Sequence, residues 1–164
     1  MSAYRRNNKG FTLVEILIVV IILGILAAIV IPQFTNASTD ARKNSLTSQL
    51  QTIRSQVELY KLQHNELLPD FAGKQWAQMT GQSDVAGTTG SGAGFDFGPY
   101  LQQTPANPLN TNTTVATGTT DATTASTFPA GTGFYVNTTN AKIWASNAKA
   151  TVLYDETTGD LVYP

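Results

Sequence analysis

The sequence predicts an α+β protein, in which one long N-terminal helix packs on a small antiparallel β-sheet. Three observations predict this fold class. An apolar run from Phe11 to Ile31 is long enough to cross a bilayer, a helical period of apolar residues resumes beyond Pro32, and short β-type runs separated by turns fill the C-terminal part. The chain has 164 residues and no cysteine, so we expect one small head without a disulfide.

Residues 1–10 form a short basic leader that precedes the apolar run. Its basic residues are Arg5, Arg6 and Lys9. At about 1.5 Å per residue, the run from Phe11 to Ile31 makes a helix of roughly 31 Å, which is the thickness of the hydrocarbon core. A secretory signal has a shorter apolar region of roughly 7 to 15 residues with small residues after it. Here Gly10 stands before the run, so cleavage after Gly10 would leave the helix on the mature chain. The positive leader predicts a cytoplasmic N-terminus and an external head.

Glu15 is the one charged residue within the apolar run. A carboxylate in a membrane helix costs about 2.5 to 3.5 kcal/mol at the helix centre, so it indicates a partner or a pathway. The alternative is that Glu15, one turn into the helix, reaches the cytoplasmic headgroups. If the chain is cut after Gly10, the new α-amine of Phe11 lies four residues from Glu15, on the same helix face. In a bundle of copies, the amine of one copy can pair with Glu15 of its neighbour, which makes Glu15 a predicted assembly determinant.

The N-terminal residues GFTLVEILIVVIILGILAAIVIP resemble the class III signal and helix of type IV pilins and type II secretion pseudopilins. The resemblance lies in Gly10, the aromatic Phe11, the glutamate four residues on, and the distal proline. It implies a pilin-like fold, cleavage between Gly10 and Phe11 by a prepilin peptidase, N-methylation of Phe11, and polymerisation into a filament. The implied partners are further copies of the chain, minor pseudopilins, the peptidase, the lipid bilayer, and an inner-membrane assembly platform with its ATPase.

Residues 32–68 are predicted to form the amphipathic half of the same helix. Its apolar residues recur at spacings of four and three, and they are Leu46, Leu50, Ile53, Val57 and Tyr60. Leu67 continues this phase through His64, and Leu68 before Pro69 is expected to close the helix.

Pro32 lies between the two halves of the predicted helix. It removes the hydrogen bond to the carbonyl of Ala28, yet the apolar period resumes beyond it, so we expect a kinked continuation. The alternative is that the membrane helix stops at Pro32. Because Gly24 and Pro32 bracket the segment with the weakest helical hydrogen bonding, we expect this segment to stretch or melt in a filament.

Residues 69–164 are expected to form the head. Residues 70–80 predict one or two helical turns with Trp76 and Met79 facing inward. Residues 80–94 and 111–127 are predicted as loops from their Gly, Thr, Ala and Ser content. Four strands follow in a predicted antiparallel meander, in the runs GFYVN, AKIWASN, TVLYD and LVYP, with the amphipathic helix covering their apolar face. We expect heads to meet through loops and the sheet edge.

Two head segments resemble the major pseudopilin pattern, namely ELYKLQHNELLPD and GPYLQQTPANPLN. Major pseudopilins commonly bind calcium in a C-terminal loop. The candidate ligands here are Asp155, Glu156 and Asp160. Calcium needs six to eight oxygens, and three acids in a short turn more often form a solvated hairpin tip. We therefore expect no cofactor and keep these residues as calcium candidates only.

Composition disfavours nucleic-acid binding and catalysis. Three of the ten basic residues lie in the leader, so its removal leaves seven against eleven acidic residues. The chain has one histidine, His64, which falls on the apolar helix phase, where a buried or C-capping role is favoured over ligation. No phosphate loop or motif-placed carboxylate pair is present, so we expect no enzyme.

The sequence therefore predicts a filament subunit, most similar to a type II secretion pseudopilin, in the bacterial inner membrane with its head in the periplasm. One alternative is a type IV pilus subunit at the cell surface, serving adhesion, motility or DNA uptake. Another is a membrane-anchored periplasmic binding module that never polymerises.

Overall fold

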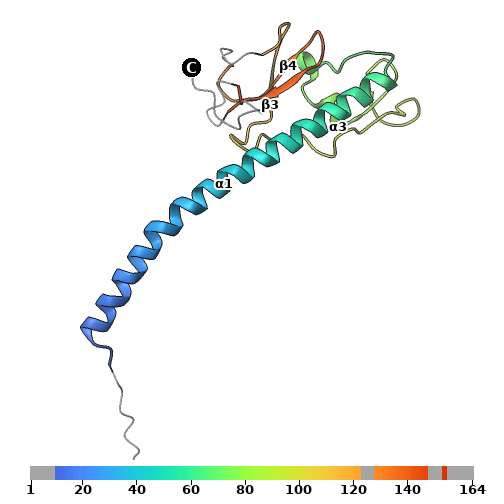
Figure 1. The fold of residues 1–164 in the computed structure, drawn as a ribbon. Helices are drawn as coiled ribbons and strands as arrows, with labels where there is room; N and C mark the ends of the chain where they lie inside the picture. The colour runs from blue at the N-terminus through green and yellow to red at the C-terminus, as the bar shows by residue number, and fades with distance from the viewer. Residues whose placement is uncertain (1–9, 123–127, 148–152, 155–164) are drawn as a thin grey trace, which may run out of the picture. The chain divides into compact units, whose positions relative to one another are not determined.

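The computed structural model describes residues 10–122, 128–147 and 153–154 (Figure 1). The elements in chain order are α1 (Leu13–Gln63), α2 (Phe71–Lys74), α3 (Ala77–Thr80), β1 (Gln82–Ser83), β2 (Thr89–Gly90), β3 (Thr114–Gly118), β4 (Thr132–Asn137) and β5 (Ile143–Ala145). The chain divides into two units, residues 1–40 and 41–164. The predicted α+β class, with a long N-terminal helix and small sheets, is confirmed.

The C-terminal half of α1 supplies one wall of the head's core. Its five predicted apolar residues are all at most 1% exposed, and they are Leu46, Leu50, Ile53, Val57 and Tyr60. They pack in one cluster with Phe134 and Val136 of β4 and Ile143 of β5. The amphipathic helix therefore covers the sheet as predicted, and α1 continues through Pro32 without interruption.

The end of α1 lies earlier than predicted. The helix stops at Gln63, because Asn65 and Glu66 take left-handed backbone angles (φ 51° and 65°) and the N–H of Glu66 donates to the carbonyl of Lys61 at 2.9 Å. This is the six-to-one bond of a Schellman cap, which asparagine at the left-handed position supports. As a consequence, Leu67 leaves the helical phase and is 49% exposed, which corrects its predicted place on the apolar face.

Two short helices follow α1, as predicted for residues 70–80. The carboxylate of Asp70 accepts a hydrogen bond from the N–H of Gly73 at 2.8 Å and caps α2. Trp76 and Met79 are buried, and the Trp76 ring meets Phe71 and Phe134 edge-on, each at 5.3 Å between centroids. The inward direction of Trp76 and Met79 is confirmed.

The segment 80–94, predicted as a loop, contains a two-stranded antiparallel sheet of β1 and β2. Asp84 organises the turn between them, since its side chain accepts from the N–H groups of Ala86 at 3.0 Å and Thr88 at 2.7 Å. Such a turn depends on one aspartate rather than on an apolar pattern.

The main sheet has the order β3-β4-β5. β4 and β5 are antiparallel, as predicted for the runs GFYVN and AKIWASN. β3 was not predicted, because it lies within the segment 111–127 that was expected to be a loop. It pairs with β4 in parallel, and Val115 is buried opposite Phe134. The β-branched residues of TTVAT favour a strand in spite of the low complexity around them, so the prediction of a loop was wrong here.

The last two predicted strands lie mostly outside the described residues. Of TVLYD, only Leu153 and Tyr154 are described. Leu153 forms an antiparallel bridge with Ser146, and the N–H of Tyr154 donates to the carbonyl of Ala145 at 2.9 Å. These contacts agree with a strand beside β5, whereas LVYP lies wholly outside the described residues.

The core contact between α1 and the sheet predicts that Leu50→Ala strongly destabilises the head. Leu50 is fully buried, so the loss of its side chain leaves a cavity and should lower the free energy of unfolding by about 2 to 5 kcal/mol. Leu62→Ala, on the same helix at 74% exposure, is the matched control and should change it by less than about 0.5 kcal/mol. Thermal unfolding of the full chain in detergent micelles, followed by tryptophan fluorescence, measures both. Equal effects of the two variants would contradict this assignment of the core.

Candidate functional site

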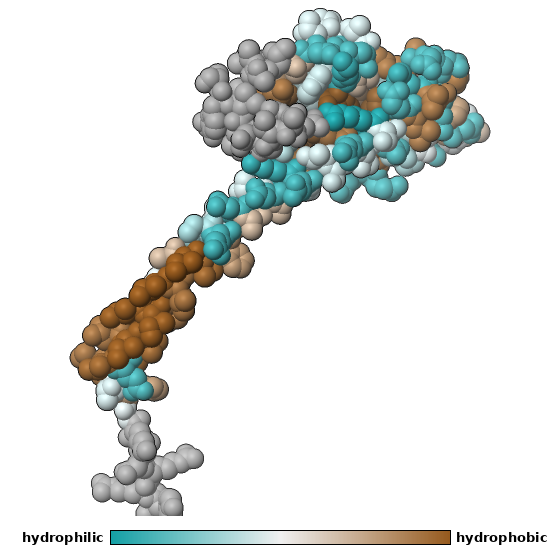
Figure 2. All heavy atoms as spheres, viewed as in Figure 1, coloured by the Kyte–Doolittle hydropathy of each residue, from teal (hydrophilic) through white to brown (hydrophobic). Residues whose placement is uncertain are grey.

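The candidate site is the apolar segment, which we define as Phe11–Phe34. Its large apolar side chains are all at least 42% exposed within the single chain. On the face that Figure 2 shows, they form a hydrophobic surface along the N-terminal part of α1. α1 is the one helix among the described residues with the length and composition to cross a membrane. A helix that is apolar all round requires lipid or other helices around it.

The start of α1 is fixed by Thr12. Its hydroxyl oxygen accepts a hydrogen bond from the N–H of Glu15 at 3.2 Å, and Glu15 is the acidic residue of the first turn. Thr12-Leu13-Val14-Glu15 has the spacing of a capping box, with threonine three residues before glutamate, and the sequence analysis missed this signal. The negative charge also interacts favourably with the positive end of the helix dipole.

The carboxylate of Glu15 has no hydrogen bond or ion pair within the described part of the chain, although its backbone N–H is engaged by Thr12. Gly10 and Phe11 lie just before α1 and are exposed, and the helix begins at Leu13 rather than at the predicted Phe11. In the chain with its leader, Phe11 is therefore not yet on the helix face of Glu15. The peptide bond between Gly10 and Phe11 is outside regular structure, as a protease substrate requires.

Gly24 and Pro32 both lie inside a continuous α1. A Cβ atom placed on Gly24 would meet nothing within 4 Å, so packing in the single chain does not require glycine there. Beyond Pro32, the hydroxyls of Thr35 and Thr39 donate to the carbonyls of Ile31 and Thr35, at 3.1 and 3.0 Å. Such side-chain bonds compete with the helical hydrogen bonds to the same two carbonyls. The stretch just beyond Pro32 thus contains a second feature that disfavours a regular helix, while the weakness predicted from Gly24 to Pro32 stays a prediction.

The calcium candidates Asp155, Glu156 and Asp160 lie outside the described residues. Within residues 10–122, 128–147 and 153–154, no group of three or more metal-ligating side chains is found.

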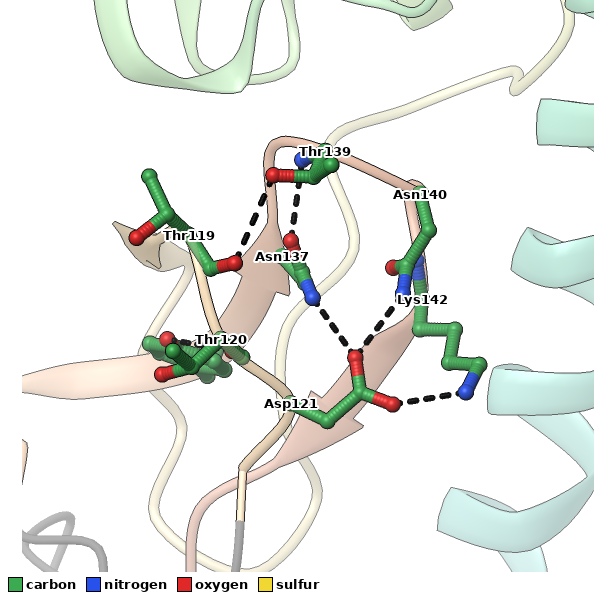
Figure 3. Close-up of polar contacts among 8 residues, drawn as sticks. Thr119, Thr120, Asp121, Asn137, Thr139, Asn140 and Lys142 are labelled. Carbon is green, nitrogen blue, oxygen red and sulfur yellow. Dashed lines mark hydrogen bonds and ion pairs between the residues drawn. The ribbon is translucent and has the colours of Figure 1, made fainter.

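Asp121 is a polar centre that the sequence analysis missed. Its carboxylate accepts hydrogen bonds from the side-chain amides of Asn137 at 2.6 Å and Asn140 at 2.8 Å, and from the ammonium of Lys142 at 2.6 Å (Figure 3). These residues fasten the chain that leaves β3 to the turn between β4 and β5. The hydrogen bonds from Lys142, Asn140 and Asn137 lower the pKa of Asp121 to about 2.

His64 has a structural role. Its ring is fully buried, stacks on Tyr60 at 3.8 Å, and contacts the carbonyl of Tyr60 at 2.8 Å through Nδ1 and the hydroxyl of Ser83 at 2.9 Å through Nε2. Because a carbonyl only accepts, Nδ1 carries the proton and Nε2 accepts from Ser83. The expected buried role of His64 is confirmed. Burial raises the pKa of the neighbouring Tyr60 to about 12.

The chain matches a known family model in its N-terminal region. The family model described as the prokaryotic N-terminal methylation motif matches residues 5–31, which include Gly10, Phe11 and Glu15. No solved structure matches the chain.

Three curated relatives illustrate the range of similar proteins. Type II secretion system core protein G of Pseudomonas aeruginosa is 43% identical over 58 residues, which are 35% of this chain and 41% of the relative. Type IV major fimbrial protein FimA of Dichelobacter nodosus is 36% identical over 86 residues, covering 52% of this chain and 55% of the relative. The ComG operon protein 3 homolog of Bacillus licheniformis is 32% identical over 66 residues, covering 40% of this chain and 68% of the relative. The chain thus spans about two fifths of the length of the type II secretion relative.

The low pKa of Asp121 predicts an acid-dependent contribution to stability. Its folded pKa of about 2 lies below the ordinary value of 3.8, so the unfolded chain binds a proton first as the pH falls. The contribution is therefore present above about pH 4 and is lost as the pH falls towards 2. Acid unfolding of the wild type and of Asp121→Asn should show a stability difference at pH 6 that vanishes near pH 2. A difference that is the same at both pH values would contradict the role of the carboxylate charge.

Proposed function

The chain belongs to the family of type IV pilins and type II secretion pseudopilins, and we propose that it is a pseudopilin that polymerises into a periplasmic filament serving protein export. The observation that carries the proposal is the apolar segment, which is exposed all round in the single chain and contains one carboxylate, Glu15, without a partner in the described residues. A surface of this kind needs both an apolar environment and a positive group.

Maturation begins at the leader. A prepilin peptidase cuts after Gly10 on the cytoplasmic face, where the basic leader keeps the N-terminus, and the new α-amine of Phe11 is methylated. The mature chain stays in the inner membrane through the apolar segment, with residues 41–164 in the periplasm. The methylation-motif match over residues 5–31 supports this sequence of events.

Assembly then joins the mature chains. The free amine of Phe11 in one copy pairs with the carboxylate of Glu15 in its neighbour, because either charge alone in a hydrophobic surrounding is penalised. An inner-membrane platform with its ATPase extracts the subunits, minor pseudopilins accompany them, and the apolar segments form the filament core. The role is mechanical, and we assign the chain no catalytic activity.

A surface type IV pilus is the second candidate function. The FimA relative supports it, because this type IV fimbrial protein is 36% identical to the chain over 86 residues. The two functions share the same maturation and the same Glu15 pairing, and they differ in the length and exposure of the filament. A membrane-anchored module that never polymerises is the alternative outside this class.

Glu15→Ala tests the proposal directly. We expect the variant to be cut after Gly10 and to remain in the membrane, but to be lost from the sheared filament fraction, because the neighbour's amine has no carboxylate to pair with. The measurement is the amount of chain in filaments and in membranes, with intact mass spectrometry of the native N-terminus. The mature wild type should begin at Phe11 and be heavier by one methyl group.

Leu62→Ala, which lies outside the apolar segment, is the control variant and should assemble like the wild type. A wild-type chain that keeps residues 1–10 in cells with an active peptidase would overturn the filament proposal. The same conclusion would follow if Glu15→Ala reached filaments in wild-type amounts.

The segment from Gly24 to Pro32 is expected to lose helical hydrogen bonds in the filament. Hydrogen exchange on filaments should therefore be faster at residues 24–32 than at residues 14–22. Gly24→Ala adds about 1 kcal/mol of helix propensity and meets no neighbour in the single chain, so it should slow exchange in this segment. Equal protection of the two segments in wild-type filaments would show that the helix stays intact there.

A further inference from the structure

β3 lies at one edge of the main sheet, since no described strand lies beyond it. In a strand, backbone groups alternate between the two sides, and at Val115 both the N–H and the carbonyl point away from β4. Because the direction alternates, the backbone N–H and carbonyl groups of Thr113 and Thr117 also point away from β4. An edge of this kind can pair with a strand of another chain.

Gln75 occupies the place that a neighbouring strand would take. Its Oε1 accepts from the N–H of Val115 at 2.7 Å, and its Nε2 donates to the carbonyl of Val115 at 3.1 Å. The second amide hydrogen donates to the carbonyl of Phe71 at 3.1 Å. The side-chain amide thus reproduces the two hydrogen bonds that one residue of an antiparallel partner strand would exchange with Val115.

The backbone of Gln75 adopts an unfavourable conformation at this position. Its φ of 51° and ψ of −122° lie in a region that glycine populates and that other residues rarely adopt. Strain of this kind persists only where surrounding contacts enforce it. Here the three hydrogen bonds of the Gln75 amide are the contacts that hold it.

Trp76 closes the adjacent position of the same edge. Its indole N–H donates to the carbonyl of Thr113 at 2.6 Å, while the ring is buried in the core. Side chains of the segment between α2 and α3 thus bond both outward groups of Val115 on β3 and the carbonyl of Thr113 just before it. Thr117 keeps its outward backbone groups, and Thr113 its outward N–H, without a hydrogen bond to described residues.

We propose that Gln75 is a strand surrogate, which closes the edge of β3 against the β3 strand of a second copy. Two copies whose edges were open could pair antiparallel over Thr113 to Thr117 and bury the same backbone groups that Gln75 and Trp76 now satisfy. The proposal holds whether or not the chain polymerises through its apolar segment, and it does not test the expected head contacts through loops and other sheet edges.

Gln75→Gly tests the proposal, because it removes the amide and at the same time accepts the unusual φ, so the head should stay folded. We expect the amide hydrogen of Val115 to lose its protection from exchange in the full chain in detergent micelles. The wild-type chain has no cysteine, so Thr117→Cys introduces a single one. In the proposed register the two copies of position 117 lie roughly 14 Å apart, four residues at about 3.4 Å each. A bifunctional thiol reagent of that span should give a several-fold rise in cross-linked dimer for Gln75→Gly over Gln75 with the same cysteine. Gln75→Asn, whose amide is one methylene too short, should act in the same direction.

Thr111→Gly is the matched control, because Thr111 also has a positive φ, of 62°, but does not contact the β3 edge through its side chain. It should leave both the exchange of Val115 and the cross-linking unchanged. Unchanged exchange at Val115 in Gln75→Gly, with tryptophan fluorescence like that of the wild type, would overturn the proposal. So would a dimer yield at Thr117→Cys that does not depend on residue 75.

Discussion

Burial of one face of α1 under the sheet is the interaction on which the head depends. Five side chains from Leu46 to Tyr60 lose almost all contact with water, and at roughly 25 cal/mol per Å² such burial supplies the main driving force for folding. Polar contacts then fix the register of this packing, since Arg54 donates to the carbonyl of Ile143 at 2.6 Å. The other half of the same helix has no covering in the single chain. One helix therefore contains a folding surface and, upstream, the surface that we propose for assembly.

The start of α1 separates the backbone contact of Glu15 from the assembly role that we propose for its carboxylate. Its backbone N–H is satisfied locally by the Thr12 hydroxyl, so the helix end does not require the carboxylate. The carboxylate is left available for a positive group from another chain, in an apolar surrounding where that pairing matters most. A helix start that used the Glu15 side chain for its own cap would compete with assembly. The local cap and the proposed intermolecular pair are thus compatible because they use different atoms of one residue.

The parts of the fold that rest on apolar periodicity could be predicted from the sequence. The repeat from Leu46 to Tyr60, the inward Trp76 and the antiparallel pair β4 and β5 all follow from which residues avoid water. The motif around Gly10 and Glu15 could be found because its residue types and spacing are specific. β3 could not, since its Thr and Ala residues carry little apolar signal, and its burial depends on Phe134, which lies nineteen residues from Val115.

The remaining differences share one feature, which is that each depends on a single polar residue rather than on a repeated apolar pattern. Asn65 permits the left-handed turn that ends α1, Asp121 fastens the exit from β3, and Gln75 supplies the hydrogen bonds of an absent strand. Each depends on one individual residue, so no periodic pattern of apolar residues predicts it. A small head without cysteine has few other means of fixing irregular backbone, because every buried N–H and carbonyl still needs a partner. Asn, Gln and Thr side chains of this head therefore stabilise its fold by hydrogen-bonding backbone groups outside the regular helices and strands.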